Sequence, residues 1–194
     1  MNTNTPELTT ERLLLRAFRK DDLHAFYEIF SDQEVNTYLP WYPLTSLVEA
    51  EQMLKDQYLR IYEEEKGYAY AICFKSDNLP IGYLNVDIEE PYDMGYGLRK
   101  EYWHQGIVTE AGQAIIKQLQ QDGIPYITAT HDVQNSRSGA VMKKLGLSYQ
   151  YTYEEQWQPK NYKVTFRLYQ RNLDNDIERC CQKYWEQSIV HYIE

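Results

Sequence analysis

The sequence predicts a single α/β domain with a mixed, mostly antiparallel sheet flanked by helices. Three strand-like segments lie close together in residues 68–98, and the short connections between them are typical of an antiparallel meander. An amphipathic helical pattern and then another strand follow, which indicates a strand-helix-strand unit. The 194 residues contain no internal repeat and no low-complexity linker, so we expect one domain.

The first third of the chain predicts a strand and two helices. Residues 11–18 form the strand, and Asp21 and Asp22 then stand at the N-cap of the first helix. The apolar residues of that helix recur at helical spacing, at Leu23, Phe26, Tyr27 and Phe30. Ser46 and Glu49 match a capping box, which begins the second amphipathic helix.

The rest of the domain predicts more strands and two further helices. Strands are expected at residues 68–74, 81–90, 93–98 and 126–131, and a closing hairpin at residues 149–157 and 162–170. A long helix begins at Ile107 and ends where Asp122 and Gly123 stop it. Asn135 caps a shorter helix that ends at Gly146.

The last stretch of the chain is expected to form an extra amphipathic helix. One stripe at helical spacing contains Ile177, Cys181, Tyr184, Ser188 and Tyr192. Such a helix docks on its own domain, which is the more common arrangement, or on a second subunit, which leaves a homodimer open. We therefore divide the chain into a domain over residues 1–171 and a helical extension over residues 172–194.

Charge and composition exclude several classes of partner. With 29 acidic and 20 basic residues, the formal net charge of −9 opposes binding to a phosphate backbone, so no direct nucleic-acid partner is expected. The sequence shows neither an apolar run of about 18 residues nor a secretory signal, which predicts a cytoplasmic protein without a membrane partner. Its three cysteines form no CxxC pair and support neither a disulfide framework nor a metal site.

Residues 103–112, WHQGIVTEAG, place one glycine directly before the long helix. The first backbone N–H groups of a helix have no partner within it, and they lie at the positive end of its dipole. Such a site suits a phosphate or a pyrophosphate. The glycine patterns of nucleoside-triphosphate loops and of dinucleotide folds are both missing. Taken alone, one glycine at a helix start is more often a plain turn.

This loop, together with residues 10–18 and 135–149, resembles the GNAT N-acetyltransferases, and most closely the branch that includes the ribosomal-protein N-terminal acetyltransferases. The resemblance covers roughly residues 8 to 170. In that family the loop grips the pyrophosphate of acetyl-CoA. The positions that match the family pattern are Trp103, Gly106, Thr109, Glu110 and Ala111. His104 and Val108 stand where a glycine and a small residue are usual, and Gln105 where a basic residue is common.

The resemblance implies that residues 1–171 form an acetyl-CoA-dependent domain in which the strand ending at Leu98 splays away from the strand at residues 126–131. The pantetheine arm of acetyl-CoA would lie between these strands and pair with backbone near Gly97 and Leu98. The residues that the resemblance assigns to acetyl-CoA are Gly97, Leu98, Trp103, His104, Gln105, Gly106, Ile107, Val108, Thr109, Asn135 and Ser138. No metal is implied.

Acetyl transfer to an amine needs a base for the amine and a proton for the departing CoA thiolate. Many family members supply that proton from a tyrosine where this chain has Met142, so the serine of the N-x-x-S motif, Ser138, inherits the role. Ser138 is alternatively a residue of the helix that Asn135 caps. The candidate bases are Asp87 and Asp93, followed by Glu89 and His131, and each is alternatively a surface residue.

The leading functional hypothesis is an N-acetyltransferase that transfers the acetyl group of acetyl-CoA to a primary amine, by direct attack in a ternary complex. The amine is a protein N-terminal α-amine, of the ribosomal-protein type, or a small cationic amine. The acidic balance and the aromatic loop with Tyr38, Trp41 and Tyr42 favour a cationic acceptor. The alternatives are an acyl-CoA-binding sensor or interaction module without turnover, and a structural protein with a relic fold.

Overall fold

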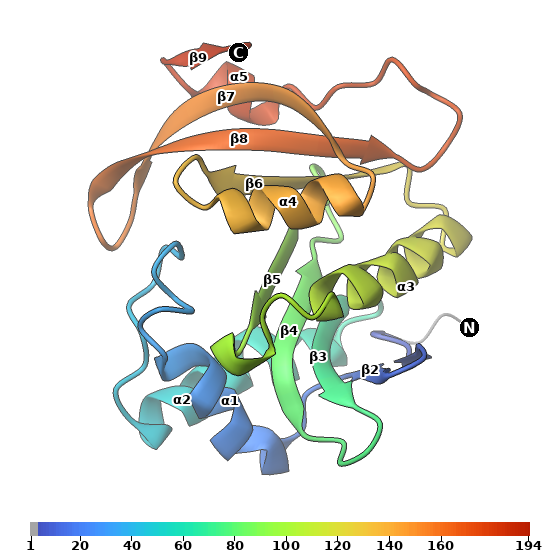
Figure 1. Cartoon of the computed structure of the whole chain (residues 1–194), viewed down its shortest axis with the longest axis vertical. Helices are drawn as coiled ribbons and strands as arrows, with labels where there is room; N and C mark the ends of the chain where they lie inside the picture. Colours follow the sequence, from blue (N-terminus) through green and yellow to red (C-terminus); the bar gives the residue numbers. More distant parts are fainter. Residues whose placement is uncertain (1–3) are drawn as a thin grey trace.

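The computed structural model describes residues 4–194, and its strands form two antiparallel sheets. One sheet has five strands in the order β1-β2-β3-β4-β5, and the other has four in the order β6-β8-β7-β9 (Figure 1). The strands are β1 (Leu8–Thr9), β2 (Leu13–Arg16), β3 (Tyr68–Phe74), β4 (Pro80–Val86), β5 (Met94–Leu98), β6 (Tyr126–Asp132), β7 (Ser148–Trp157), β8 (Tyr162–Asn172) and β9 (His191–Tyr192). The meander and the closing hairpin that the sequence predicts are both confirmed.

The described residues form five α-helices, of which the first four lie where the sequence places them. They are α1 (Leu23–Ser31), α2 (Leu47–Leu54), α3 (Ile107–Gln121), α4 (Ser136–Lys144) and α5 (Lys183–Gln187). The second predicted helix is longer than α2 because a π-helical turn, Lys55–Leu59, continues it. Ser46 caps α2 by accepting a hydrogen bond from the N–H of Glu49, as the capping box predicts.

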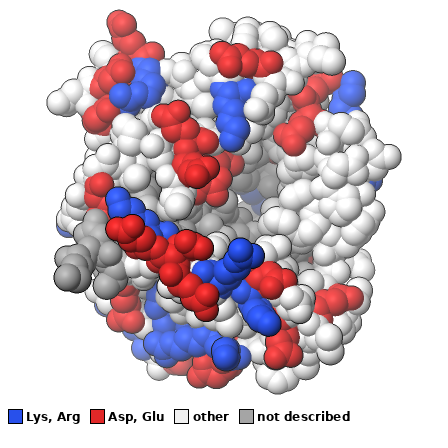
Figure 2. Space-filling model, turned by 180° about the vertical axis from the view of Figure 1, so that it is seen from behind, with Lys and Arg blue, Asp and Glu red and all other residues white. Residues whose placement is uncertain are grey.

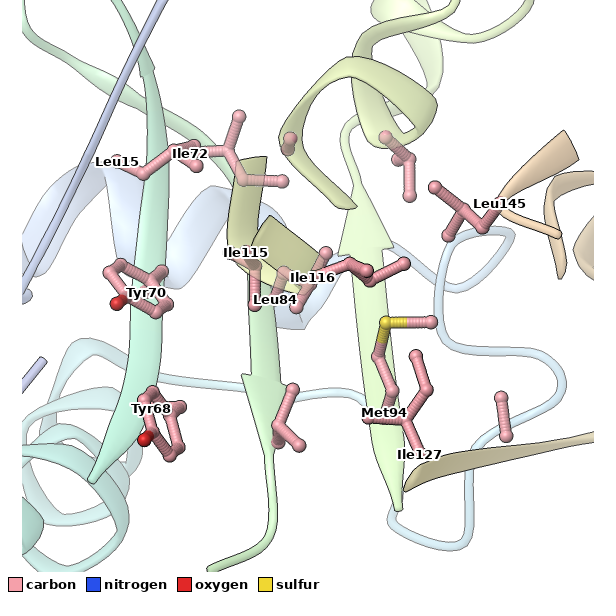
Figure 3. Packing of buried hydrophobic residues seen from close by; sticks show 14 of the residues in the cluster. Leu15, Tyr68, Tyr70, Ile72, Leu84, Met94, Ile115, Ile116, Ile127 and Leu145 are labelled. Atoms are coloured by element: carbon pink, nitrogen blue, oxygen red, sulfur yellow. The ribbon is translucent and has the colours of Figure 1, made fainter. Parts of the chain in front are cut away.

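The five-stranded sheet is covered by helices on both faces. Along β3, alternate residues enter different clusters: Tyr70 and Ile72 pack with α3, whereas Ala71 and Cys73 pack with α1 and α2. Figure 3 shows the first of these clusters, in which Ile115 and Ile116 of α3 lie over the strands. Burying one such large side chain contributes about 1.5–3 kcal/mol, so the first cluster holds α3 on one face of the sheet and the second holds α1 and α2 on the other.

β5 and β6 are neighbours that diverge. Among residues 4–194 a single parallel bridge joins them, between Asp93 and Thr128, and the N–H of Thr128 donates to the carbonyl of Tyr92 at 3.3 Å. Met94 and Ile127 pack at this narrow end (Figure 3). Beyond it β5 runs almost vertically and β6 almost horizontally in Figure 1. The predicted splay is confirmed, and we use "the splay" for the region between β5 and β6 beyond the bridge.

The C-terminal stretch departs from the prediction of one long amphipathic helix. Only α5, Lys183–Gln187, is helical, and β9 then adds to β7 through the pairs Thr152–Tyr192 and Tyr153–His191. The segment docks on its own domain, since Cys181, Tyr184 and Trp185 pack against the four-stranded sheet. The boundary at residue 171 and the homodimer stay predictions.

Three further features bear on function. All three cysteines are free thiols. No helix within residues 4–194 is long and apolar enough to span a membrane. In the same residues no three or more His, Cys, Asp or Glu side chains gather in a way that would hold a metal ion.

Candidate active site

The loop before α3 presents a row of unpaired backbone donors. His104 and Gly106 both have left-handed backbone, with φ of 61° and 73°. The first N–H of this region with a partner belongs to Glu110, which donates to the carbonyl of Gly106 at 2.9 Å. Within the described chain, no hydrogen bond is made by the N–H groups of residues 105–109. These donors lie at the positive end of a 15-residue helix, an arrangement that suits an anion.

Glu110 ties this loop to the first sheet. Its carboxylate accepts hydrogen bonds from the hydroxyl of Thr10 and from the Nε of Arg12, the latter at 2.7 Å. The guanidinium of Arg12 also donates to the carbonyl of Gln105 at 3.0 Å. Because these contacts hold both ends of the turn, the unpaired N–H groups are fixed in position before any ligand arrives.

The side chains of the loop residues that differ from the family pattern do not crowd these N–H groups. Ile107 and Val108 are buried in the core with α3, so only their backbone N–H groups remain at the loop. His104 is exposed and adopts the left-handed conformation that a glycine takes without cost. The structure thus keeps the loop geometry with different side chains.

The backbone of β5 is bonded to β4 through its odd-numbered residues. The N–H of Arg99 donates to the carbonyl of Ile81 at 2.9 Å, and the N–H of Asp87 donates to the carbonyl of Asp93 at 3.0 Å. Successive residues of a strand direct their N–H and C=O groups to opposite sides. The even-numbered residues of Met94–Leu98 therefore direct theirs toward the splay.

Gly97 and Leu98, which the sequence groups together, thus face different strands. Gly97 is bonded toward Tyr83 of β4, and a Cβ at Gly97 would overlap the Tyr83 ring, so this glycine serves packing. The backbone of Gly97 is therefore occupied by β4 and that of Tyr96 faces the splay, while the assignment of Gly97 to acetyl-CoA stays a prediction. The Leu98 carbonyl already accepts from the indole of Trp103 at 2.7 Å, which leaves its N–H toward the splay.

At the start of α4, Asn135 is the capping residue, and Ser138, whose N–H it caps, contacts Tyr96 of β5. The side chain of Asn135 accepts from the N–H of Ser138 at 3.3 Å, which confirms the predicted cap. The Ser138 Oγ lies 2.9 Å from the hydroxyl of Tyr96, and that hydroxyl is 3.0 Å from the Ser138 carbonyl. Burial raises the pKa of Tyr96, so its hydroxyl stays protonated at neutral pH.

Arg137 connects the start of α4 to the loop before α3. Its guanidinium lies over the ring of Trp103, 5.0 Å from the ring centroid, in a cation–π contact. The chain lacks a basic residue at Gln105, where the family resemblance leads one to expect it. Arg137 brings a positive charge to the same loop from α4.

The two predicted carboxylate candidates lie together at the narrow end of the splay. Asp87 and Asp93 are bonded through their backbones across β4 and β5, which places their side chains on the same face. The carboxylate of Asp93 accepts from the Thr128 hydroxyl at 2.9 Å. Burial raises the pKa of Asp93 to about 7, and the neighbouring Asp87 adds to that shift.

Asp93 and Ser138 approach the splay from opposite faces of the sheet. Met94 and Leu98 pack with α3, and Tyr96, which stands midway between them along the strand, lies on the same face. Asp93, one residue earlier, points to the face that α1 and α2 cover. A carboxylate and a hydroxyl thus flank the strand from opposite sides.

The remaining base candidates do not share the position of Asp93. Glu89 is an exposed residue of the turn between β4 and β5. His131 is buried beneath α4, where its Nδ1 lies 2.7 Å from the Asp132 carbonyl and its Nε2 has no partner among the described residues. A Cβ at Gly139 would lie 2.6 Å from that Nε2, so the glycine makes room for the ring. Burial lowers the pKa of His131.

A pocket of about 250 Å³ lies between the aromatic loop and the outer ends of β6 and β8. Tyr38 lines it, together with Asp132 and Tyr162. Trp41 instead turns inward and donates its indole N–H to Asn36 at 3.2 Å. The hairpin between β7 and β8 closes one side, because Lys160 donates to the carbonyl of Leu39 at 2.8 Å, and Figure 1 shows the two loops approaching each other.

A family model described as an acetyltransferase (GNAT) domain matches residues 12–148, which include the loop before α3 and the whole of α4. The chain belongs to the GNAT acetyltransferase family. Its reaction class is therefore acyl transfer, and the predictions of the family and of an enzyme are confirmed.

Other GNAT proteins resemble the chain over most of its length. An uncharacterised N-acetyltransferase, YnaD of Bacillus subtilis (strain 168), is 28% identical over 144 residues, which are 72% of this chain and 81% of YnaD. Among solved structures, a ribosomal L7/L12 α-N-protein acetyltransferase, RimL, in complex with coenzyme A has a TM-score of 0.76 at 21% identity, covering 88% of this chain and 100% of that one. The ribosomal-protein-S5-alanine acetyltransferase from Vibrio fischeri has a TM-score of 0.71 at 18% identity, covering 88% and 98%. These structures show that the GNAT fold is shared.

Proposed function

We propose that this GNAT protein transfers the acetyl group of acetyl-CoA to a primary amine, with both substrates bound at the splay. The observation that carries the proposal is the unpaired row of N–H groups at residues 105–109, which lies where the strand β5 leads into α3. Acetyl-CoA supplies an activated thioester, and its pyrophosphate is the kind of anion that such a row binds. The outward backbone of Tyr96 and Leu98 continues from this row along the splay.

The residues around the donor fit this ligand in chemistry. The N–H groups of Tyr96 and Leu98 offer donors to a pantetheine amide or to the oxygen of a thioester carbonyl. Arg137 adds a positive charge near the pyrophosphate, while Glu110 holds the loop without occupying it. The side chain of Val108, which stands where a small residue is usual, lies in the core and therefore does not crowd the pyrophosphate.

Asp93 and Ser138 divide the proton transfers in this proposal. A primary amine with a pKa of about 8–10 must lose a proton before it attacks, and Asp93, with a pKa of about 7, is matched to accept it directly or through water. Ser138 supplies a proton to the departing thiolate, and Tyr96 then returns one to Ser138 through their 2.9 Å contact.

The acceptor enters from the face that carries Asp93. Its neighbours Asp87 and Glu155 are acidic, and the outer pocket also contains Asp132, so the charge around this face favours a cationic amine. Two of the structures that share the fold are named for acetylating ribosomal-protein N-termini, which supports an α-amine at a peptide end as the acceptor. The pocket beside Tyr38 would receive the residues that follow that amine.

A panel assay tests the function. Purified protein would be incubated with acetyl-CoA and with peptides that begin with Ala, Ser or Met, with polyamines and with aminoglycosides, and both free CoA thiol and the acetylated product would be measured. An enzyme-only blank accounts for the three cysteines. We expect acetylation of at least one class of amine. Binding of acetyl-CoA without any acetylated product would favour the acyl-CoA sensor instead.

Replacing Ser138 with alanine should lower kcat by about 10²-fold while leaving the Kd for acetyl-CoA within a factor of about two. Tyr96→Phe should lower kcat less, by about tenfold, because Ser138 keeps its own proton but loses the group that restores it. Steady-state kinetics on the best acceptor and calorimetric binding of acetyl-CoA measure both effects. Equal losses of kcat and of binding in Ser138→Ala would instead assign Ser138 to the helix cap alone.

Arg137→Ala should raise the Kd for acetyl-CoA by about tenfold, which corresponds to about 1.4 kcal/mol. The reason is the loss of a charge beside the anion site, so the effect should shrink as salt is added. Lys144, an exposed residue at the other end of α4, provides the matched control as Lys144→Ala. An Arg137→Ala protein that binds acetyl-CoA as tightly as the wild type at low salt would contradict this role.

A further inference from the structure

The C-terminal segment packs on the acceptor face of the molecule, beside Asp93. On β6, Ile127 and Ala129 face α3, so Thr128 and Thr130 face the opposite side, where Cys181 and Tyr184 pack. This is the side to which Asp93 points, because its carboxylate accepts from the Thr128 hydroxyl. The segment thus covers the second sheet on the face where α1 and α2 cover the first.

Aromatic contacts connect α5 to this face. The ring of Tyr184 stacks on that of Tyr153, with centroids 4.9 Å apart and planes 7° apart. The Tyr153 hydroxyl interacts with the Thr130 hydroxyl, two residues along β6 from the partner of Asp93. Trp185 packs edge-on against Tyr151 at 5.3 Å. The stack therefore lies on the same face of β6 as the Asp93 carboxylate.

Several bonds hold α5 in this place. The N–H of Cys181 donates to the Gln170 side chain at 2.7 Å, and the hydroxyl of Ser188 donates to the Glu154 carbonyl at 2.7 Å. Beyond them, β9 pairs with β7, and Glu194 forms an ion pair with Arg167 at 2.7 Å. With anchors on both sides, α5 is fixed against the sheet.

Seen from behind, the surface is hollowed near its centre, and both acidic and basic side chains lie around the hollow (Figure 2). The hollow lies between the upper part of the molecule, which contains β7 and the C-terminal segment, and the lower part, which contains α1 and α2. An acceptor that approaches Asp93 from this face passes between these two parts.

We propose that the C-terminal segment forms one wall of the acceptor site and tunes its base. Tyr184 shields Asp93 from water, and Lys183 holds a positive charge beside Asp93 and Asp87. Both are positioning residues, since they act on the amine through Asp93. The inference deepens the proposed function and rests on it only for the role of Asp93 as base. The GNAT family model ends at residue 148, so this wall lies outside the matched part of the chain.

The charges around Asp93 give the two residues opposite effects. The titratable groups that act on it come from both sheets and from the segment: Asp87, Tyr96, Tyr153, Glu155, Cys181, Lys183 and Tyr184. Burial raises the pKa of Asp93, and Lys183 lowers it. Removing the shielding ring should therefore lower the pKa of Asp93, whereas removing the ammonium group should raise it.

The test is a direct titration of the Asp93 carboxyl by ¹³C NMR in protein labelled at aspartate, with Asp93→Asn used to identify its resonance. The wild-type midpoint is expected at about 7. Tyr184→Ala should move it down by about one unit, Lys183→Gln should move it up by a few tenths of a unit, and Tyr184→Phe should restore the wild-type value. Glu186→Gln, an exposed neighbour on α5, is the matched control and should leave the midpoint in place.

Thermal unfolding of each variant checks that the segment stays docked, and Tyr184→Phe and Lys183→Gln remove no apolar ring from the cluster. An unchanged midpoint in Tyr184→Ala, or a downward shift in Lys183→Gln, would overturn the inference. The proposed function fails separately, if the wild-type protein forms no acetylated product, and the role of Asp93 as base fails if Asp93→Asn keeps the full acetylation rate. Shifted midpoints together with an acidic limb of kcat/KM that shifts in parallel would support both.

Discussion

Replacing Gly106 with valine is expected to raise the Kd for acetyl-CoA by at least about 100-fold, or about 2.7 kcal/mol. Gly106 has φ of +73°, which a β-branched residue adopts only at a substantial cost. A Cβ at this position would meet only the Arg12 guanidinium, at 4.0 Å, so crowding is not the reason. The valine would instead move the backbone, and the row of N–H groups at residues 105–109 would lose its common direction. Isothermal calorimetry with acetyl-CoA measures the loss.

Gly123 offers a matched control for this change. It ends α3 with φ of +77°, and a Cβ there would have no neighbour within 4 Å. Gly123→Val therefore imposes a similar backbone strain at the other end of the same helix. We expect it to lower the free energy of unfolding by about 1–2 kcal/mol and to leave the Kd for acetyl-CoA unchanged. Equal binding losses in the two variants would mean that strain in α3, and not the loop, decides affinity.

Asp93→Asn is expected to lower kcat/KM for the amine by about 10²- to 10⁴-fold while acetyl-CoA still binds. In the wild type, kcat/KM should rise with pH through about 7, because Asp93 accepts a proton only after it has lost its own. The variant should lose that limb and keep only the limb of the amine, near its pKa of about 8–10. A pH profile of kcat/KM for both proteins, with one acceptor, measures the difference.

Asp87→Asn separates the base from its neighbour. The negative charge of Asp87 raises the pKa of Asp93, so its removal should move the acidic limb to lower pH without abolishing turnover. If Asp87→Asn lost as much activity as Asp93→Asn, the two carboxylates would share the role of base. If neither lost activity, water or the acceptor itself would carry the proton.

The elements of the fold follow from periodicity in the sequence. The apolar run of β3 predicts a buried strand, and the spacing of Ile115 and Leu119 in α3 predicts one buried face, and both are confirmed. The turn before α3 is predicted equally well, because Gly106 directly precedes the helical spacing that begins at Ile107. Structure that depends on a local pattern, such as a helix, a strand or a turn, can therefore be predicted from the sequence alone.

Contacts between distant strands escape such patterns. Tyr96 stands between two glycines and looks like an ordinary strand residue, and its contact with Ser138 joins positions 42 residues apart. Gly97 and Leu98 cannot be told apart until the register of β4 and β5 is known, because one step along the strand reverses the direction of the N–H group. The proximity of Asp87 and Asp93 depends on the same register.

The C-terminal segment shows a different limit. Its residues match a helical stripe, but Ile189, Val190 and Ile193 are β-branched, which lowers helix propensity. The edge of β7 offers unpaired backbone groups, and β9 binds there instead of continuing α5. Pairing with β7 therefore outweighs the helical spacing of the apolar residues in this segment.

The most direct test of the central claim, that the splay between β5 and β6 is the donor site, is a crystal structure of the protein with acetyl-CoA. The account predicts the pyrophosphate on the N–H groups of residues 105–109, and the pantetheine arm beside Tyr96 and Leu98, with the thioester between Asp93 and Ser138. Acetyl-CoA bound elsewhere, for example in the pocket beside Tyr38, with those N–H groups unchanged, would contradict it.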